Sequence, residues 1–192
     1  MSTYLNLMMG AKSESKREDN DFYATHPTAT RSFLDKIISD NIRLSPNIWE
    51  CACGEGHISE VLKEYGYNVR SSDLIDRGYG EVKNFLDTTY LENDFDILTN
   101  PPYKIAEDFV EKAMSLLKKG RKLILFLKIQ FLESKKRLEL FKKFPPKYVY
   151  IHSERQLTSK DGSFETYNAK SIAYIWIIWE KGFNGETVLR WI

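Results

Sequence analysis

The stretch that decides the fold runs from Asp96 to Tyr103 and reads DILTNPPY. Residues 97–99 are apolar or β-favouring, which predicts a short buried strand at 96–99. The two prolines end it, because proline has no N–H and pushes the residue before it into an extended conformation. Asn100 is therefore expected at the carboxyl end of the strand, with its amide directed away from the sheet and Tyr103 beside it. An amide acceptor next to a flat ring suits a planar amine-bearing group; the plain alternative is a strand followed by a Pro-Pro turn.

Length and composition indicate a single globular domain. The chain has 192 residues, of which 42% are hydrophobic and 29% charged, enough to bury a full core. The longest apolar run, at 172–179, is far shorter than the roughly 20 residues of a membrane span. Residues 1–20 are polar and lack the apolar segment of a signal peptide. We expect a flexible arm at 1–20, a folded domain at 21–192, and a cytoplasmic location.

Two cysteines, Cys51 and Cys53, lie two residues apart. Because no further His or Cys cluster accompanies them, they make a poor metal site. Buried thiols in a reducing compartment are the preferred interpretation, and no metal is expected.

The net charge of +1 conceals an asymmetry along the chain. Residues 1–100 carry 10 basic and 17 acidic residues, whereas residues 101–192 carry 18 and 10. The basic excess is concentrated at 118–147, with 11 basic residues against two glutamates. A one-sided basic face is typical of proteins that bind a polyanion; a solvated helix surface would give the same pattern.

Strand and helix patterns alternate along the chain. Apolar runs predict strands, and apolar residues at spacings of three and four predict helices. This alternation is typical of a doubly wound α/β fold, here a mostly parallel seven-stranded sheet with helices on both faces. The polar segment 152–169 is expected to be irregular. The expected strands are 48–52, 68–72, 81–86, 96–99, 122–127, 148–151 and 172–179, and the expected helices are 28–40, 58–65, 105–119 and 132–144.

A glycine-containing turn follows the first expected strand, in the sequence ECACGEG at 50–56. A dinucleotide site would have a third glycine, in the pattern Gly-x-Gly-x-x-Gly, but Ser59 stands there. Glu50 and Glu55 place negative charge where a pyrophosphate would lie. S-adenosylmethionine, with a sulfonium, an ammonium and no phosphate, fits better, and Asp73 at the end of the next strand can accept from two ribose hydroxyls.

These motifs together resemble the S-adenosylmethionine-dependent DNA adenine-N6 methyltransferases, in particular the compact phage-type enzymes. ECACGEG is similar to their cofactor-binding motif, and Asn100-Pro101-Pro102-Tyr103 is similar to their catalytic motif. The sequence FYATHP at 22–27 resembles the aromatic-Thr-Pro motif that precedes their first strand. The resemblance spans about Asp21 to Gly182. It implies a Rossmann-like class I methyltransferase fold, S-adenosylmethionine as cofactor, and nucleic acid, most of all DNA, as partner.

The resemblance also implies a role for each site residue. The adenine N6 amine would be held by the catalytic motif, in which Asn100 and the Pro101 carbonyl accept its N–H groups and Tyr103 stacks on the base. This sequence departs from the family pattern at His26, Cys51 and Asn84. The implied catalytic residues are Asn100, Pro101, Pro102 and Tyr103. The implied cofactor-binding residues are Tyr23 and Thr25 near the methionine end, Glu50, Gly54 and Gly56 around the amino acid and sulfonium, Asp73 at the ribose, and Asn84 and Phe85 at the adenine.

Other functions stay open at this point. Asn-Pro-Pro-Tyr indicates that the reacting group is an amine, but it does not indicate which polymer carries that amine. An rRNA base or a protein glutamine is therefore an alternative substrate. A non-catalytic nucleic-acid-binding relic of the fold is a further alternative. The oligomeric state and the recognition sequence are not readable from the chain.

Overall fold

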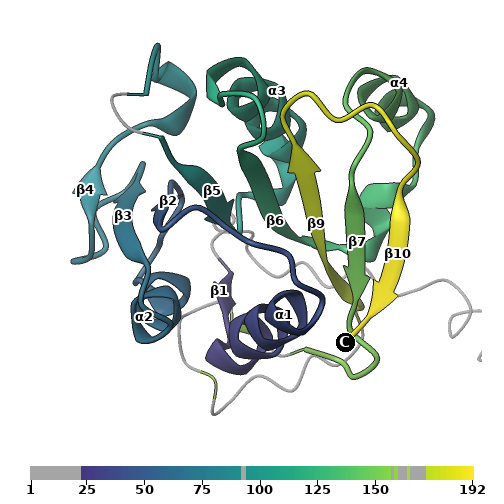
Figure 1. Ribbon diagram of the computed structural model, residues 1–192. Coiled ribbons are helices and arrows are strands. Elements are labelled where there is room, and N and C mark those ends of the chain that lie inside the picture. The colour runs from purple at the N-terminus through teal and green to yellow at the C-terminus, as the bar shows by residue number, and fades with distance from the viewer. Residues whose placement is uncertain (1–22, 92–93, 157, 160–163, 165–171) are drawn as a thin grey trace, which may run out of the picture.

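The computed structural model describes residues 23–91, 94–156, 158–159, 164 and 172–192. The expected arm at 1–20 therefore lies outside the described residues. Helices and strands alternate as the sequence predicts (Figure 1). The strands are β1 (Ala24–Thr25), β2 (Asn47–Glu50), β3 (Asn68–Asp73), β4 (Glu81–Val82), β5 (Asp96–Thr99), β6 (Lys122–Lys128), β7 (Tyr148–Ile151), β8 (Thr158–Ser159), β9 (Tyr174–Glu180) and β10 (Val188–Trp191); the α-helices are α1 (Pro27–Ser39), α2 (His57–Glu64), α3 (Ala106–Leu116) and α4 (Lys135–Lys143); the 3₁₀ turns are η2 (Phe85–Asp87), η3 (Tyr103–Ile105) and η4 (Ile129–Leu132).

The main sheet has the order β10-β7-β9-β6-β5-β2-β3-β4. Strand β9 is antiparallel to both β6 and β7, and every other neighbouring pair is parallel. From β2 the chain builds outward through β3 and β4, then returns to place β5 on the other side of β2. The sheet thus reverses its direction of growth between β2 and β5, where doubly wound folds bind their ligands at the carboxyl ends of the strands. The expected mostly parallel α/β fold is confirmed.

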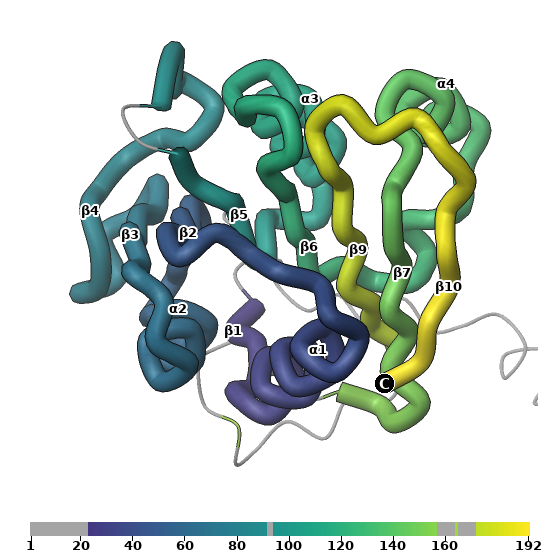
Figure 2. Tube along the Cα trace, viewed as in Figure 1, coloured from purple at the N-terminus to yellow at the C-terminus, as the bar shows by residue number. Residues whose placement is uncertain are grey.

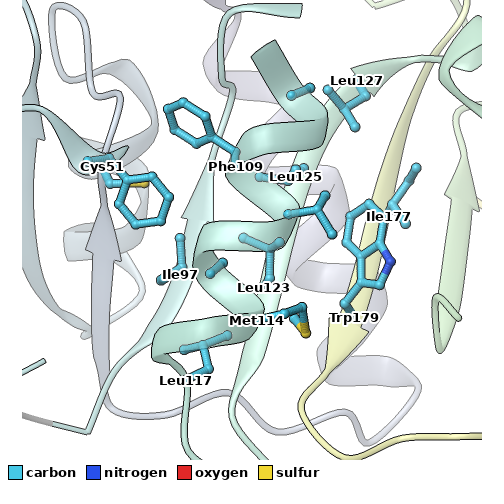
Figure 3. Close-up of a cluster of buried hydrophobic side chains, with 14 of the residues drawn as sticks. Cys51, Ile97, Phe109, Met114, Leu117, Leu123, Leu125, Leu127, Ile177 and Trp179 are labelled. Carbon is cyan, nitrogen blue, oxygen red and sulfur yellow. The ribbon is translucent and has the colours of Figure 1, made fainter. Parts of the chain in front are cut away.

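The core consists of two apolar layers, one on each face of the sheet. Successive strand residues point to opposite faces, so Ile97 packs in the layer under α3 while Leu98 packs in the layer under α1 and α2. Figure 3 shows α3 lying across β5 and β6, with Met114 and Leu117 directed at the sheet. Because both faces are covered, the central strands are apolar throughout, as β6 and β9 are.

The hydrogen bonds of buried Asp96 fix where β5 begins. Its Oδ2 accepts from the Ser45 N–H at 2.7 Å, and its Oδ1 accepts from the Lys122 N–H at 2.8 Å. One carboxylate thus joins the start of β5 to the loop before β2 and to the start of β6. This arrangement sets the register of the three strands that meet at the switch point.

The structure differs from the sequence-based expectations in several elements. The sheet has eight strands, because β10 pairs in parallel with β7. The expected strand at 81–86 is wrong beyond Val82, since the Asn84 side chain accepts from the Leu86 N–H and begins η2 instead. The expected helix at 132–144 is divided into η4 and α4, with Ser134 as the N-cap of α4. The polar segment after β7 contains β8, which pairs with β1.

The C-terminal strand closes the sheet beside the first helix. Figure 2 follows the chain from β9 across to β10, which ends next to α1. Arg190 pairs with Asp40, the C-cap of α1, at 3.1 Å. Among the described residues, we find no helix with the length and apolar character that crossing a bilayer requires.

Replacing Asp96 tests the register account. Asp96→Ala leaves two backbone N–H groups without their acceptor. It should therefore lower the free energy of unfolding by about 2–4 kcal/mol, measured from urea unfolding curves. Asp94, an exposed partner of the same Arg121, is the matched control, and Asp94→Ala should cost less than about 1 kcal/mol. Equal losses in the two variants would contradict the role given to Asp96.

Candidate active site

A pocket of about 210 Å³ opens at the carboxyl edge of the sheet, at the switch point between β2 and β5. Its walls come from β1, the turn after β2, the ends of β3 and β5, and the turns η2 and η3. The pocket brings together ten of the twelve site residues that the sequence singled out, and Gly54 and Gly56 are the two that do not line it. The ten are Tyr23, Thr25, Glu50, Asp73, Asn84, Phe85, Asn100, Pro101, Pro102 and Tyr103.

The side chain of Asn100 is fixed in one orientation. Its Nδ2 donates to the Tyr23 carbonyl oxygen at 2.8 Å and to Thr25 Oγ1 at 2.9 Å. A carbonyl oxygen can only accept, so the nitrogen of the amide must face β1 and the oxygen must face the other way. Oδ1 is buried and has no hydrogen-bond partner among the described residues. A buried polar atom without a partner is costly and needs an explanation, and a ligand N–H would supply one.

Two tyrosine rings lie next to this amide. Tyr23 and Tyr103 stack with their centroids 5.7 Å apart and their planes 26° apart. The ammonium of Lys128, at the end of β6, lies 4.4 Å from the Tyr103 centroid and 5.1 Å from that of Tyr23. Tyr103 thus lines the pocket together with Asn100, and its ring carries a cation on its face.

The two glycines of the turn after β2 shape the pocket without lining it. Gly54 has φ 55° and Gly56 has φ 85°, backbone conformations that residues other than glycine rarely adopt. The Gly54 N–H donates to Asp73 Oδ2 at 2.8 Å. A Cβ at Gly56 would lie 2.5 Å from the Tyr79 ring. Gly56 therefore makes room for a ring of the protein, which the sequence did not indicate.

Two carboxyl groups lie in the pocket wall. Glu50, at the end of β2, is 1% exposed and hydrogen-bonded to Ser59 Oγ. Burial raises the pKa of Glu50 well above its ordinary value, and the neighbouring charge of Asp73 adds to the rise. Asp73 accepts from the Gly54 and Ile75 N–H groups, and each carboxylate oxygen has a further lone pair for a ligand. The wall is thus suited to a cation or to hydroxyl groups.

Asn84 and Phe85 line the far side of the pocket. The Asn84 amide already has two partners, accepting from the Leu86 N–H at 3.1 Å and donating to Asp87 Oδ2 at 3.0 Å. Phe85 is 2% exposed and packs edge-on against Trp49 at 5.3 Å. Phe85 offers an apolar surface to a ligand, while Asn84 also holds η2 in place.

The sequence missed several pocket residues that follow its motifs directly. His57 comes after the glycine turn, Leu74 and Ile75 come after Asp73, and Lys104 comes after Tyr103. Residues that follow parallel strands lie at the same edge of the sheet, and this rule could have found them. Cys51 and Cys53 also line the pocket, and both are free and buried. Burial raises the pKa of Cys53 to about 12, so its thiol is protonated at neutral pH.

Comparison with known proteins identifies the fold. No protein-family model matches the chain, and no curated protein matches it by sequence. Among solved structures, a candidate class I S-adenosylmethionine-dependent methyltransferase from Listeria monocytogenes superposes with a TM-score of 0.62 at 14% identity, over 91% of this chain and 67% of that one. The chain has the class I methyltransferase fold. At this identity the likeness shows the fold alone.

Two further structures with this fold have different described roles. A modification subunit of a candidate type I restriction enzyme from Vibrio vulnificus has a TM-score of 0.60 at 16% identity, over 88% of this chain and 46% of that one. A candidate RNA methyltransferase from Pyrococcus horikoshii has a TM-score of 0.58 at 13% identity, over 85% and 92%. This chain therefore spans less than half of the restriction-enzyme subunit.

Glu50→Gln tests the burial of the pocket carboxyl. Above the ordinary Glu pKa of 4.5 the unfolded chain releases this proton while the folded chain retains it, so the wild type loses stability as the pH rises. Gln cannot titrate. The variant should therefore unfold at a higher temperature than the wild type at pH 8, and the difference should shrink towards zero near pH 4, as measured by thermal unfolding across pH.

The control is Glu55→Gln in the same turn, where the side chain is exposed. It should change stability by less than about 0.5 kcal/mol. A Glu50→Gln variant that is less stable than the wild type at pH 8 would contradict the raised pKa.

Proposed function

We propose that this protein transfers a methyl group from S-adenosylmethionine to an exocyclic amine, and that the amine is N6 of adenine in DNA. The observation that carries the proposal is the buried, unpartnered Oδ1 of Asn100, in an amide whose nitrogen is held by β1. That atom is a hydrogen-bond acceptor prepared for an N–H donor. Asn100 lines the pocket of a class I methyltransferase fold.

The residues of the pocket fit S-adenosylmethionine. Its sulfonium and ammonium are cationic, and Asp73 gives the pocket wall a carboxylate for them, while the buried Glu50 adds a carboxyl group that can form hydrogen bonds. Asp73, at the end of β3, would hold the ribose, and the apolar surface of Phe85 beside Asn84 would receive the adenine. Tyr23 and Thr25 would lie near the methionine end. Gly54 and Gly56 would contribute by shaping the turn that carries Glu50 and Asp73 to the pocket.

The chain's own residues would prepare the nucleophile. The cofactor supplies a methyl group on a good leaving group, so positioning provides most of the rate. The main obstacle is that the amine is a weak nucleophile, because its lone pair is delocalised into the ring. Asn100 Oδ1 and the Pro101 carbonyl would each accept one N–H, favouring the positive charge that develops on nitrogen. Tyr103 would stack on the base, and Pro102 would keep the turn rigid.

Adenine in DNA is favoured by the resemblance of the Asn-Pro-Pro-Tyr and aromatic-Thr motifs to DNA adenine methyltransferases. In duplex DNA the target base would have to be flipped out of the stack to enter the pocket. RNA is the second candidate, because a structure described as a candidate RNA methyltransferase shares the fold over most of both chains.

The test is transfer of tritiated methyl from S-adenosylmethionine to DNA, RNA and protein side by side, with mass spectrometry of the labelled product. We expect N6-methyladenine from DNA. If label appears only in RNA or in protein, the proposed substrate is wrong but the proposed methyl-transfer reaction stands. Absence of S-adenosylmethionine binding by calorimetry would favour a non-catalytic relic of the fold.

Removing the Asn100 amide should separate chemistry from cofactor binding. Asn100→Ala loses the proposed contact to the target amine, so the rate of methyl transfer should fall at least 10²–10³-fold, as for loss of a transition-state hydrogen bond elsewhere. The dissociation constant for S-adenosylmethionine should change little, as measured by calorimetry. Transfer at a near wild-type rate would refute the assignment of Asn100.

Thr25 should act as a positioning residue for the same amide. Thr25→Val keeps the shape of the side chain but removes one of the two acceptors of Asn100 Nδ2, so kcat should fall by about fivefold, in keeping with roughly 1 kcal/mol for one hydrogen bond. KM for the methyl acceptor should move less than kcat. Thr25→Ser restores the hydroxyl and should recover most of the rate; equal loss in both variants would indicate that the methyl group, and not the hydroxyl, matters.

A further inference from the structure

The basic stretch at 118–147 is largely neutralised within the fold. At least seven of its eleven basic side chains form ion pairs with acidic residues of the described chain, which lie far away in sequence or on the same helix. They are Arg121 with Asp94 and Asp96, Lys122 and Lys147 with Glu180, Lys136 and Arg137 with Glu107, Lys142 with Glu139, and Lys143 with Glu111. The sequence-level excess therefore does not amount to a uniformly basic face.

Arg137 in particular is a structural residue. Its Nε donates to Glu107 Oε1 at 3.1 Å, and its Nη1 donates to the carbonyls of Gln130 and Glu133 at 2.9 and 3.0 Å. The guanidinium holds the start of α4 to the start of α3. It has little capacity left for a phosphate, although the sequence made it a candidate for one.

The contact between Arg137 and Glu107 brings the lysines at the start of α4 close to Lys104. Lys104 lines the pocket, is exposed, and has no ion-pair partner among the described residues. It lies three positions before Glu107, so the two share one side of the segment formed by η3 and α3. Glu107 in turn holds Lys136, whose side chain is 81% exposed. Lys135 is the first residue of α4 and is exposed as well. We call Lys104, Lys135 and Lys136 the lysine ledge.

The pocket thus has two electrically different sides. Glu50 and Asp73 lie at the ends of β2 and β3, while the lysine ledge follows β5 and β6 on the other side of the switch point. Lys128, over the face of the Tyr103 ring, adds a further cation between the ledge and Asn100. An anion would be drawn to the side of the lysine ledge.

We infer that the lysine ledge binds the phosphate backbone of the nucleic-acid strand whose base enters the pocket. The inference rests on the proposed function and specifies its substrate further, as a polyanion that approaches over the starts of α3 and α4. A polymer substrate needs such contacts, because phosphate contacts fix the register of a strand while the pocket reads the base. The stacked tyrosines beside the ledge suit a base better than a peptide side chain.

The test compares two double variants with equal loss of charge. Lys104→Gln with Lys135→Gln removes two cations of the ledge. Lys118→Gln with Lys119→Gln is the matched control, because both lysines are exposed and without ion pairs in the described chain. They follow the far end of the 11-residue helix α3, about 16 Å along its axis from the pocket edge. Thermal unfolding should give wild-type melting temperatures for both double variants, which verifies folding.

The readout is the affinity for an adenine-containing duplex as a function of salt, together with KM for methyl transfer. The ledge variant should bind about tenfold more weakly at low salt, and its slope of log K against log salt should be smaller by about 1.8, which corresponds to two lost phosphate contacts. The control variant should match the wild type. If wild-type protein methylates DNA but both variants keep the wild-type salt slope and KM, the proposed role of the lysine ledge is wrong while the proposed function stands. If wild-type protein methylates no nucleic acid, the proposed function fails first.

Discussion

The site depends on two hydrogen bonds that Asn100 Nδ2 donates to β1, one to the Tyr23 carbonyl and one to Thr25 Oγ1. The main sheet fixes where the backbone of Asn100 lies, because β5 is central and its start is tied by Asp96. It does not fix which way the amide points. That choice is made by a two-residue strand 75 positions earlier in the chain, which the antiparallel partner β8 holds in place. Two short strands that are distant from Asn100 in sequence therefore determine the orientation of its amide.

Charge is arranged around this amide according to the order of the strands. β3 and β4, from the acidic first half of the chain, lie on one side of the switch point, and β6, β7, β9 and β10, from the basic second half, lie on the other. Most of the basic residues in 118–147 are used to hold helices and strands together, as Arg137 does. Lys135 is exposed at the start of α4, Lys128 lies over the face of the Tyr103 ring, and Lys104 lines the pocket. A net charge near zero is thus compatible with a site that has one acidic and one basic side.

Local patterns in the sequence predicted the central part of the structure well. The apolar strand before Asn100 and the glycine turn before α2 could be predicted because their signals lie within a few residues. Strand β10, the β1–β8 pair and the ion pairs of Arg137 could not, because each depends on a partner distant in sequence. Gly56 shows the same limit. Its φ of 85° follows from the turn, but the Tyr79 ring, which occupies the space that a Cβ of residue 56 would need, comes from a separate loop. Asn84 was predicted as a ligand contact, and its local capping of η2 was overlooked.

The central claim is that the Asn100 amide is locked in the free protein with its oxygen towards the pocket. Nuclear magnetic resonance can test this directly through the scalar coupling that a hydrogen bond transmits between Asn100 Nδ2 and the Tyr23 carbonyl carbon. We predict a measurable coupling and slow solvent exchange of the Nδ2 protons in the absence of any ligand. Fast exchange without coupling, in a protein that is otherwise folded, would show that the amide is free to turn and would contradict the account.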